Sequence, residues 1–329
     1  MDSTKVAFSA IKIRNILDTE AGAQKGATDC TIGSHSQKFA IVQAIYPSYR
    51  EGDYNREVAF HRLLQGHPNL VRFVAEVDFE GVLSDRNKPR YAWLLEYLPV
   101  TLEQFVMQKP PPSHAQRCWV ALQIVRGMAF MHSKHVIHRD LKPDNVLLDS
   151  LETLNAKIID FDLSVMDNAG VMCDEVGSQA YMAPELFGYR DATSRSRQEV
   201  EPKPLTSLVD VWAVGMVLLY VFTGKKPWPG RTIAEPMEEI LVDERRLPDA
   251  LQELSGDPLR LVQQCLRYDD RISSAELLSL AEECLGVYDP NNKAPEHKTP
   301  DPVSVMSTPS EPGTLPTAGF ALTVFLVLT

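Results

Sequence analysis

Two short stretches of the chain, "VIHRDLKPDNVLL" (136–148) and "KIIDFDLS" (157–164), carry side chains that could act on a phosphoryl group. Asp140 and Asn145 lie in one polar segment with Lys142 between them, and Asp160 follows a short apolar run. Carboxylate and amide oxygens suit Mg²⁺, and an ammonium group neutralises phosphoryl charge. The pattern therefore predicts a cleft for a Mg²⁺-bound polyphosphate. The alternative is a polar loop with unrelated charges.

The elements that must position these residues change in character along the chain. Four apolar-patterned strands and one helix are expected in the first hundred residues: "KIRNIL", "KFAIVQAIY", "NLVRFVAEVDF", "RYAWLLEYL" and the helical "YNREVAFHRLLQG". After residue 100 helical patterns dominate, as in "SHAQRCWVALQIVRGMAFMHSK". The sequence thus predicts an α+β fold with a small sheet-containing N-terminal lobe and a larger helical C-terminal lobe.

The ordered motifs resemble those of the protein kinase family over residues 8–287. The resemblance implies a bilobal fold, with a small antiparallel-sheet N-lobe (8–97) and a helical C-lobe (98–287), and it implies ATP and Mg²⁺ as cofactors. By position, Asp140 would orient the substrate hydroxyl, Lys142 would steady the γ-phosphate, and Asn145 and Asp160 would hold the metal. The "LKPDN" form implies serine/threonine hydroxyls of a protein substrate.

Further motifs follow in the order that this resemblance implies. "GSQAYMAPE" (177–185) resembles the segment that seats the substrate, and its Glu185 would pair with Arg271. "DVWAVG" (210–215) resembles a core helix whose Asp210 braces the catalytic loop. His138 and Phe161 would pack between the two lobes.

The nucleotide side is matched by "LLEYL" (94–98), which resembles the hinge between the lobes. The backbone groups of Glu96 and Leu98 would bind adenine, with Leu95 as gatekeeper and Leu147 as the floor of the pocket. Glu57 falls at the position of the helix glutamate that normally pairs with a strand lysine; a solvated helix charge is its alternative reading.

The strand that should carry this lysine reads "IVQAI", and the alignment puts Gln43 in the lysine position. Glutamine can hydrogen-bond a phosphate but brings no charge. Moving the alignment by one residue does not restore a cation, because Val42 then takes the place. Ile41 stands where the family has alanine above the adenine.

The glycine-rich loop is also incomplete, and "EAGAQKGA" (20–27) is its best candidate. Placing Gly22 on the middle glycine puts Lys25 on the last one. This arrangement resembles the with-no-lysine kinases, in which a second-strand lysine enters the cleft. Lys25 would then supply the phosphate-directed charge and pair with Glu57; the alternative is a solvated loop lysine.

Two more departures concern the segment from Asp160 to Glu185. Asp162 replaces the glycine of the usual "DFG", where glycine reaches unusual backbone angles at no steric cost. Arg139 precedes Asp140, and the usual phosphosite falls on Asp174, beside Glu175. These carboxylates would partly stand in for phosphate, or they are a solvated acidic loop.

Composition limits the partners and the compartment. A formal net charge of −11 argues against a nucleic-acid partner, and five scattered cysteines without a CxxC pair indicate a reducing, cytoplasmic compartment. Residues 288–317 are rich in Pro, Ser and Thr and are expected to be a disordered linker. The apolar tail "AGFALTVFLVLT" (318–329) is shorter than the roughly 20 residues that span a bilayer, so no membrane partner is expected.

Two classes of function remain open. The first is a serine/threonine kinase with an atypical nucleotide grip, and the second is a pseudokinase that acts as a binding scaffold. The side chains for chemistry are kept, whereas the losses fall on the side that grips the nucleotide. The sequence indicates neither an oligomeric state nor the role of the insertion at 188–207.

Overall fold

The computed structural model of the chain describes residues 5–7, 10–16, 25–32, 37–44, 50–78, 91–167, 169–173, 176–187, 204–228 and 245–286. For residues 13–16, 25–28 and 44 it describes the backbone only. The expected linker (288–317) and apolar tail (318–329), together with Gly22, Asp174, Glu175 and residues 188–203, lie outside the described residues.

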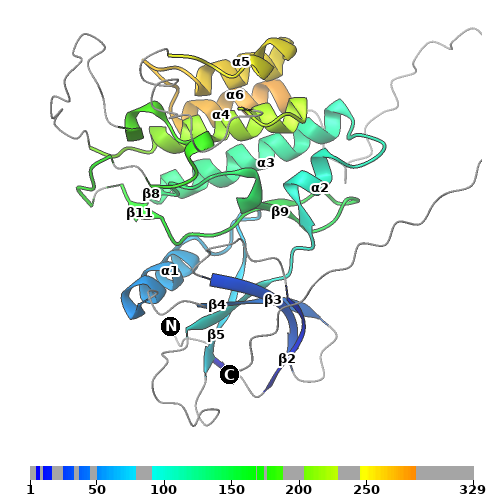
Figure 1. Cartoon of the computed structure of the whole chain (residues 1–329), viewed down its shortest axis with the longest axis vertical. Coiled ribbons are helices and arrows are strands. Elements are labelled where there is room, and N and C mark those ends of the chain that lie inside the picture. Colours follow the sequence, from blue (N-terminus) through cyan, green and yellow to red (C-terminus); the bar gives the residue numbers. More distant parts are fainter. Residues whose placement is uncertain are drawn as a thin grey trace, which may run out of the picture. The chain divides into compact units, whose positions relative to one another are not determined.

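The N-terminal part is built on a six-stranded sheet with one helix (Figure 1). The sheet order is β1-β5-β6-β4-β3-β2, and every pair in it is antiparallel except β1 with β5, which is parallel. Its elements are β1 (Lys5–Ala7), β2 (Ile11–Ile16), β3 (Lys25–Ile32), β4 (Lys38–Ala44), α1 (Glu51–Leu63), β5 (Phe73–Asp78) and β6 (Ala92–Glu96). The expected antiparallel sheet is therefore present, with one short parallel strand added at its edge.

The connection from β1 to β2 requires this sheet to curl. Ala7 and Ile11 are separated by four residue steps, which span about 14 Å at most. The two strands lie at opposite edges, five spacings apart, which would be about 24 Å in a flat sheet. The edges must therefore approach one another. Consistent with this, Val6 and Ile11 both pack against one cluster of buried residues inside the curl: Cys30, Phe39, Ile41, Ala75, Val77, Ala92 and Leu94.

The two faces of β4 are consequently distinct. Ile41 pairs with Leu94 and belongs to the cluster inside the curl. Val42 pairs with Trp93, and both pack in the main core together with Val58 and Phe60 of α1. Because side chains alternate along a strand, even-numbered residues of β4 face α1 and odd-numbered residues face the interior of the curl.

The C-terminal part is mainly helical, with two small sheets that carry the loops (Figure 1). The sheets are β7-β9-β10 and β8-β11. The elements are β7 (Val100–Thr101), α2 (Leu102–Val106), α3 (His114–Ser133), β8 (Val136–Ile137), β9 (Val146–Leu148), β10 (Ala156–Ile158), β11 (Val165–Met166), α4 (Leu208–Thr223), α5 (Gly256–Cys265) and α6 (Ser274–Leu285). The α+β class predicted from the sequence is confirmed.

Local sequence signals explain where the long helices begin and end. Ser113 caps α3: its hydroxyl accepts from Gln116 N at 3.2 Å, and the Gln116 side chain accepts from Ser113 N at 2.8 Å. The central helix α4 is apolar on nearly all sides and is buried along Val209–Val221. It ends at Gly224, whose φ of +73° places it in the left-handed region.

Helix α4 also depends on a small residue for its packing. A Cβ atom at Gly215 would lie 2.5 Å from Cys265 Cβ, so only glycine allows α5 to approach this closely. No helix in the described part of the chain has the length and apolar character needed to cross a membrane.

Candidate active site

The catalytic-loop residues predicted from the sequence lie between β8 and β9. Hydrogen bonds from the loop backbone to a side chain of α4 hold this loop in place. Asp210 of α4 is buried, and its two carboxylate oxygens accept from His138 N at 2.7 Å and Arg139 N at 2.9 Å. It also lies 2.8 Å from His132 Nε2. The predicted brace by Asp210 is confirmed. Burial alone would raise the pKa of Asp210, but the His132 and His138 contacts hold it below its usual range.

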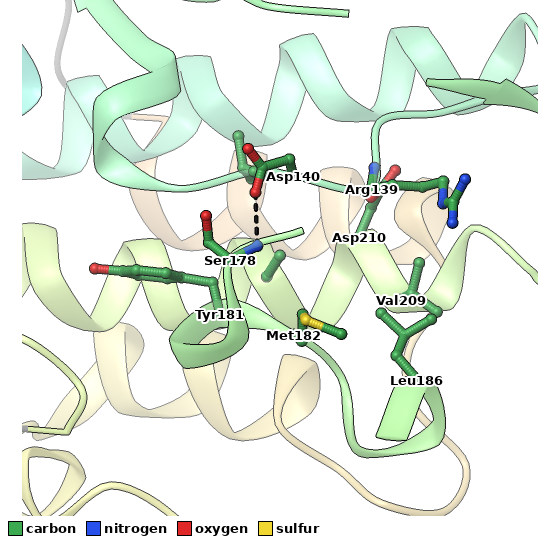
Figure 2. Close-up of a pocket in the computed structure, with 10 residues that line it drawn as sticks. Arg139, Asp140, Ser178, Tyr181, Met182, Leu186, Val209 and Asp210 are labelled. Atoms are coloured by element: carbon green, nitrogen blue, oxygen red, sulfur yellow. Dashed lines mark hydrogen bonds between the residues drawn. The ribbon is translucent and has the colours of Figure 1, made fainter. Parts of the chain in front are cut away.

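Asp140 has polar contacts with three residues, of which Figure 2 draws the one with Ser178. Its Oδ1 accepts from Ser178 N at 2.8 Å, and its Oδ2 lies 3.2 Å from Asn145 Nδ2 and 3.5 Å from Lys142 Nζ. The Asp140 side chain is 11% exposed, so it stays accessible at one side. These contacts hold the Asp140 carboxylate in one orientation, next to the side chains of Lys142 and Asn145.

The contact with Ser178 requires a glycine at the preceding position. Gly177 has φ +113°, and a Cβ there would lie 2.5 Å from the carbonyl oxygen of Arg139. The "GS" of "GSQAYMAPE" thus brings the later segment onto the catalytic loop. Ser178 was not predicted as a site residue, although its place directly after a glycine in a matched motif was a usable signal.

Asp140 also borders a small pocket of about 10 Å³, the size of a single water. Figure 2 draws the residues that line it, which come from the catalytic loop, the "GSQAYMAPE" segment and α4: Arg139, Asp140, Leu141, Ser178, Tyr181, Met182, Leu186, Val209, Asp210 and Ala213. A pocket of this size holds no substrate, so it marks packing beneath the catalytic loop.

The metal-ligand candidates come together through the backbone of β10. Ile159 N donates to the carbonyl oxygen of Asn145 at 3.0 Å, so Asp160 follows directly beside Asn145. Asn145 Nδ2 donates to Asp140 O at 2.7 Å, which fixes the orientation of the amide. Its Oδ1 accepts no hydrogen bond from the described residues and is thus available to a cation. Two neighbouring hard oxygen donors fit Mg²⁺ held together with a polyphosphate.

The segment after β10 is packed against α1. Phe161 is fully buried, with ring centroids 4.8 Å from His61 and 5.9 Å from His138. The predicted packing of His138 with Phe161 is confirmed. Arg56 Nη2 also donates to the carbonyl oxygen of Asp162 at 3.2 Å. Both contacts join α1 to the segment that carries Asp160.

The replacement of glycine by Asp162 is accommodated without strain. Asp160 has the left-handed φ of +66°, which aspartate tolerates better than most residues, whereas Asp162 is not among the residues with positive φ. The backbone at Asp162 therefore does not need the conformational freedom of glycine.

The residues predicted for the nucleotide side lie on β6, in the connection after it, and on β9. Leu95 and Leu98 are buried, and Leu147 pairs with Lys157 and Thr101 between the neighbouring strands. The backbone N–H and C=O of Leu98 take part in no hydrogen bond among the described residues, which leaves them available to a ligand. Glu96 lies at the end of β6, and its side chain pairs with Lys157 Nζ at 2.7 Å.

The register of β4 corrects the predicted place of Gln43. Gln43 pairs with Ala92 and Gly26, on the face inside the curl, while Val42 pairs with Trp93 on the face toward α1. Ile41 likewise lies inside the curl, and Ala40 packs toward the main core. Val42 therefore occupies the position expected for the lysine, and Ala40 the one expected for the alanine above adenine. The prediction failed because a one-residue slip exchanges the two faces of a strand.

Glu57 and Lys25 are placed by these same elements. Glu57 of α1 is 1% exposed, and its Oε1 lies 3.9 Å from Nε2 of the equally buried His61. Lys25 begins β3 opposite Ala44, two residues beyond Val42 on the row that faces α1. His61 was not predicted as a site residue, although its spacing of four residues from Glu57 on a helix was a signal.

The structural pair predicted at the end of the substrate-seating segment is present. Arg271 Nη1 and Nη2 donate to the two carboxylate oxygens of Glu185 at 2.6 and 3.2 Å. Arg271 Nη1 also donates to Leu208 O at 2.8 Å, and its guanidinium lies 5.0 Å from the ring centre of Trp212. The prediction for Glu185 and Arg271 is confirmed.

Curated relatives resemble the chain over about two thirds of its length or more. The chain is 31% identical over 71% of its length to RGS domain-containing serine/threonine-protein kinase A of Dictyostelium discoideum. It is 30% identical over 68% to serine/threonine-protein kinase PkaA of Streptomyces coelicolor, and 28% over 67% to the carbon catabolite-derepressing protein kinase of Saccharomyces cerevisiae. The alignments span only 19%, 38% and 32% of these relatives' own lengths.

A family model described as "Protein kinase domain" matches residues 22–285, well over half of the chain. This match includes the catalytic loop with Asp140, the metal candidate Asp160 and the Glu185–Arg271 pair. Together with the two-part α+β fold, it shows that the chain belongs to the protein kinase domain family.

Proposed function

We propose that the chain is an active serine/threonine protein kinase that transfers the γ-phosphoryl group of ATP to protein hydroxyls. The observation that carries this proposal is the fixed Asp140 carboxylate, with Ser178 N at 2.8 Å, Asn145 Nδ2 at 3.2 Å and Lys142 Nζ at 3.5 Å. Asp140 orients the incoming hydroxyl and accepts its proton. Lys142 neutralises charge on the phosphoryl group during transfer.

The nucleotide would be held by residues on both sides of the hinge. The backbone groups of Glu96 and Leu98 bind adenine, and Leu147 forms the floor beneath it. Asn145 Oδ1 and the Asp160 carboxylate hold Mg²⁺, which supplies charge neutralisation between the phosphates when it is bound.

The strand lysine of the family is replaced in this proposal by Lys25. Val42 brings no charge to the face toward α1, whereas Lys25 lies on the same row of the sheet through its pairing with Ala44. Glu57 is buried in this region, and a buried carboxylate is stabilised by a cation. Lys25 therefore pairs with Glu57 and directs its charge toward the phosphates.

A pseudokinase scaffold is the second candidate, and the uncharged Val42 in the lysine position favours it. The two functions differ in turnover. A scaffold has no need for the Asp140 carboxylate, whereas a kinase loses proton acceptance and hydroxyl orientation without it, a contribution of about 10²–10⁴ in rate.

Transfer of labelled γ-phosphate from ATP to Ser/Thr peptides, with Tyr peptides in parallel, distinguishes the two. We expect label on Ser/Thr peptides with the wild type, none on Tyr peptides, and almost none with Asp140→Asn. Asp249→Asn, the same change at an exposed carboxylate, serves as the control and keeps full transfer. No incorporation by either protein would leave the scaffold as the function, whereas equal incorporation by wild type and Asp140→Asn would contradict the role given to Asp140.

A further inference from the structure

A second cavity, of about 330 Å³, lies apart from the catalytic loop and is partly open to solvent. It is lined by the connection after α1, the end of β6, α3, and β10 with the turn that precedes it: Pro68, Asn69, Glu96, Gln123, Asp149, Asn155 and Lys157. None of the residues assigned to phosphoryl transfer or metal binding lines it, although Glu96, whose backbone is assigned to adenine, does. Its volume is at the lower end of the range of small-ligand sites, about 300–1,000 Å³.

One wall of the cavity is a fixed pair of buried amides. Asn69 is 5% exposed and Gln123 is 3% exposed. Asn69 Nδ2 donates to Gln123 Oε1 at 3.0 Å and to Ala156 O at 3.1 Å, so the amide orientation is determined by two acceptors. Gln123 Oε1 also accepts from Ala156 N at 3.1 Å, and its Nε2 donates to Leu154 O at 2.7 Å. Both polar atoms of the Gln123 side chain are therefore occupied by hydrogen bonds within the protein.

This arrangement leaves the Oδ1 acceptor of Asn69 without a hydrogen-bond donor among the described residues, and Asn69 lines the cavity. Oδ1 is not one of the fully buried side-chain atoms that lack a partner, so it is open to solvent although the residue as a whole is 5% exposed. An accessible acceptor of this kind is hydrated when the cavity holds no ligand and can accept from a donor that replaces the water. The cavity therefore presents an acceptor to a ligand.

Two further side-chain oxygens of the lining residues also lack a hydrogen-bond donor among the described residues. Glu96 Oε1 accepts from Lys157 Nζ and from Arg72 N, both at 2.7 Å, while its Oε2 has no donor in the described part of the chain. Asn155 Nδ2 donates to Asp149 Oδ2 at 2.6 Å, which leaves Asn155 Oδ1 free of donors from the described residues. Three side chains that line the cavity thus each keep one oxygen without a donor in the described part of the chain, beside one competing ammonium, that of Lys157.

The charge of the lining is negative. Burial alone would raise the pKa of Asp149, but hydrogen bonds from Thr153, Asn155 and Ser150 hold it below its usual range. With Glu96 the lining carries two carboxylates against the single ammonium of Lys157. A ligand that donates several hydrogen bonds and carries positive charge is complementary to this site.

The geometry points to a guanidinium group as the ligand of this cavity. Guanidinium offers five N–H donors in one plane, whereas an ammonium offers three from a single point. A divalent cation is disfavoured because the described residues contain no group of three or more His, Cys, Asp or Glu side chains placed to hold a metal. The guanidinium belongs either to a small molecule or to an arginine side chain of a bound peptide.

Thermal unfolding of the full chain in the absence of nucleotide tests this assignment. N-acetylarginine amide should raise the midpoint saturably, because a ligand that binds only the folded state stabilises it. N-acetylcitrulline amide, which has the same shape without the charge, should have no effect. An arginine-containing tripeptide that binds more tightly than the amide assigns the ligand to a peptide, and equal binding assigns it to a small molecule.

Two substitutions with opposite expected effects separate binding from damage to the fold. Glu96→Gln should lower the affinity for N-acetylarginine amide by about tenfold or more. Lys157→Met should raise this affinity, because the competing ammonium is removed. Glu152→Gln, an exposed carboxylate in the neighbouring turn, should leave binding unchanged. An equal response to citrulline, no saturable response in the wild type, or weaker binding in Lys157→Met would overturn the assignment. These outcomes are independent of phosphoryl transfer.

Discussion

Asp210 Oδ2 accepts a hydrogen bond from the backbone nitrogen of His138 at 2.7 Å, across 72 residues of sequence. Its other oxygen accepts from Arg139 N at 2.9 Å. Arg139 has φ +71°, a left-handed conformation that is unfavourable for arginine. The shape of the catalytic loop, and with it the place of Asp140, therefore depends on one buried carboxylate of α4.

Replacing Asp210 with Asn should destabilise the protein and slow phosphoryl transfer. The amide puts a donor where two backbone N–H groups need acceptors, and we expect the free energy of unfolding to fall by about 3 kcal/mol. Urea unfolding measures this loss, and Asp249→Asn, at an exposed side chain, should show no comparable loss. An Asp210→Asn protein as stable as the wild type would contradict the role of the brace.

The same carboxylate should give the fold an acid-sensitive component. The pKa of Asp210 is lower in the folded state than its ordinary value of 3.8. Its contribution to stability is therefore complete above this value and is lost as the pH falls through the lower, folded-state pKa. Unfolding followed from pH 5 downward should show a steeper loss for the wild type than for Asp210→Asn. Parallel pH dependences in the two proteins would refute this expectation.

Substituting Arg271 with Lys should weaken the attachment of the substrate-seating segment. Lysine cannot reproduce the two parallel hydrogen bonds to Glu185 or the stacking on Trp212, and the Arg271 side chain is only 3% exposed. We expect a loss of about 2 kcal/mol in unfolding free energy. Arg260→Lys, at an exposed pair with Glu283, is the matched control and should leave stability essentially unchanged.

Restoring glycine at Asp162 should change little in catalysis. Because Asp162 does not have a positive φ, glycine gains nothing there and adds freedom to the unfolded chain. We expect the free energy of unfolding to fall by about 0.5–1 kcal/mol, with turnover close to that of the wild type. A loss of turnover of about tenfold, equivalent to about 1.4 kcal/mol in the barrier, would show that the Asp162 carboxylate takes part in the reaction.

The helical half was predictable because several positions in its motifs each require one particular residue type. The carboxylate at 210, the glycine at 177 and the Glu185–Arg271 pair occupy positions where no other residue type meets the same geometric demand. Their order along the chain, through its resemblance to the protein kinase pattern, was enough to predict the fold class, the Asp210 brace and the Glu185–Arg271 pair.

The N-terminal half was harder to predict because its central strand is apolar on both faces. In "KFAIVQA" the residues on either side of β4 are compatible with burial, so the pattern did not determine which row faces α1. Only the pairing with β6, and the contact of Trp93 with α1, settles that Val42 and not Gln43 holds the position. The Glu96–Lys157 pair was likewise not predicted, because no motif in the sequence joins these two residues, which lie 61 positions apart.

We propose that the phosphate-directed charge comes from Lys25, on the row of β3 and β4 that faces α1. The affinity for Mg²⁺-ATP tests it directly. Lys25→Met should weaken binding by about tenfold or more, while Lys12→Met, at an exposed lysine of β2, should not. Adding Val42→Lys to Lys25→Met should restore binding, and adding Gln43→Lys should not, because these two positions lie on opposite faces. Unchanged affinity in Lys25→Met, or rescue by Gln43→Lys rather than Val42→Lys, would contradict this role of Lys25.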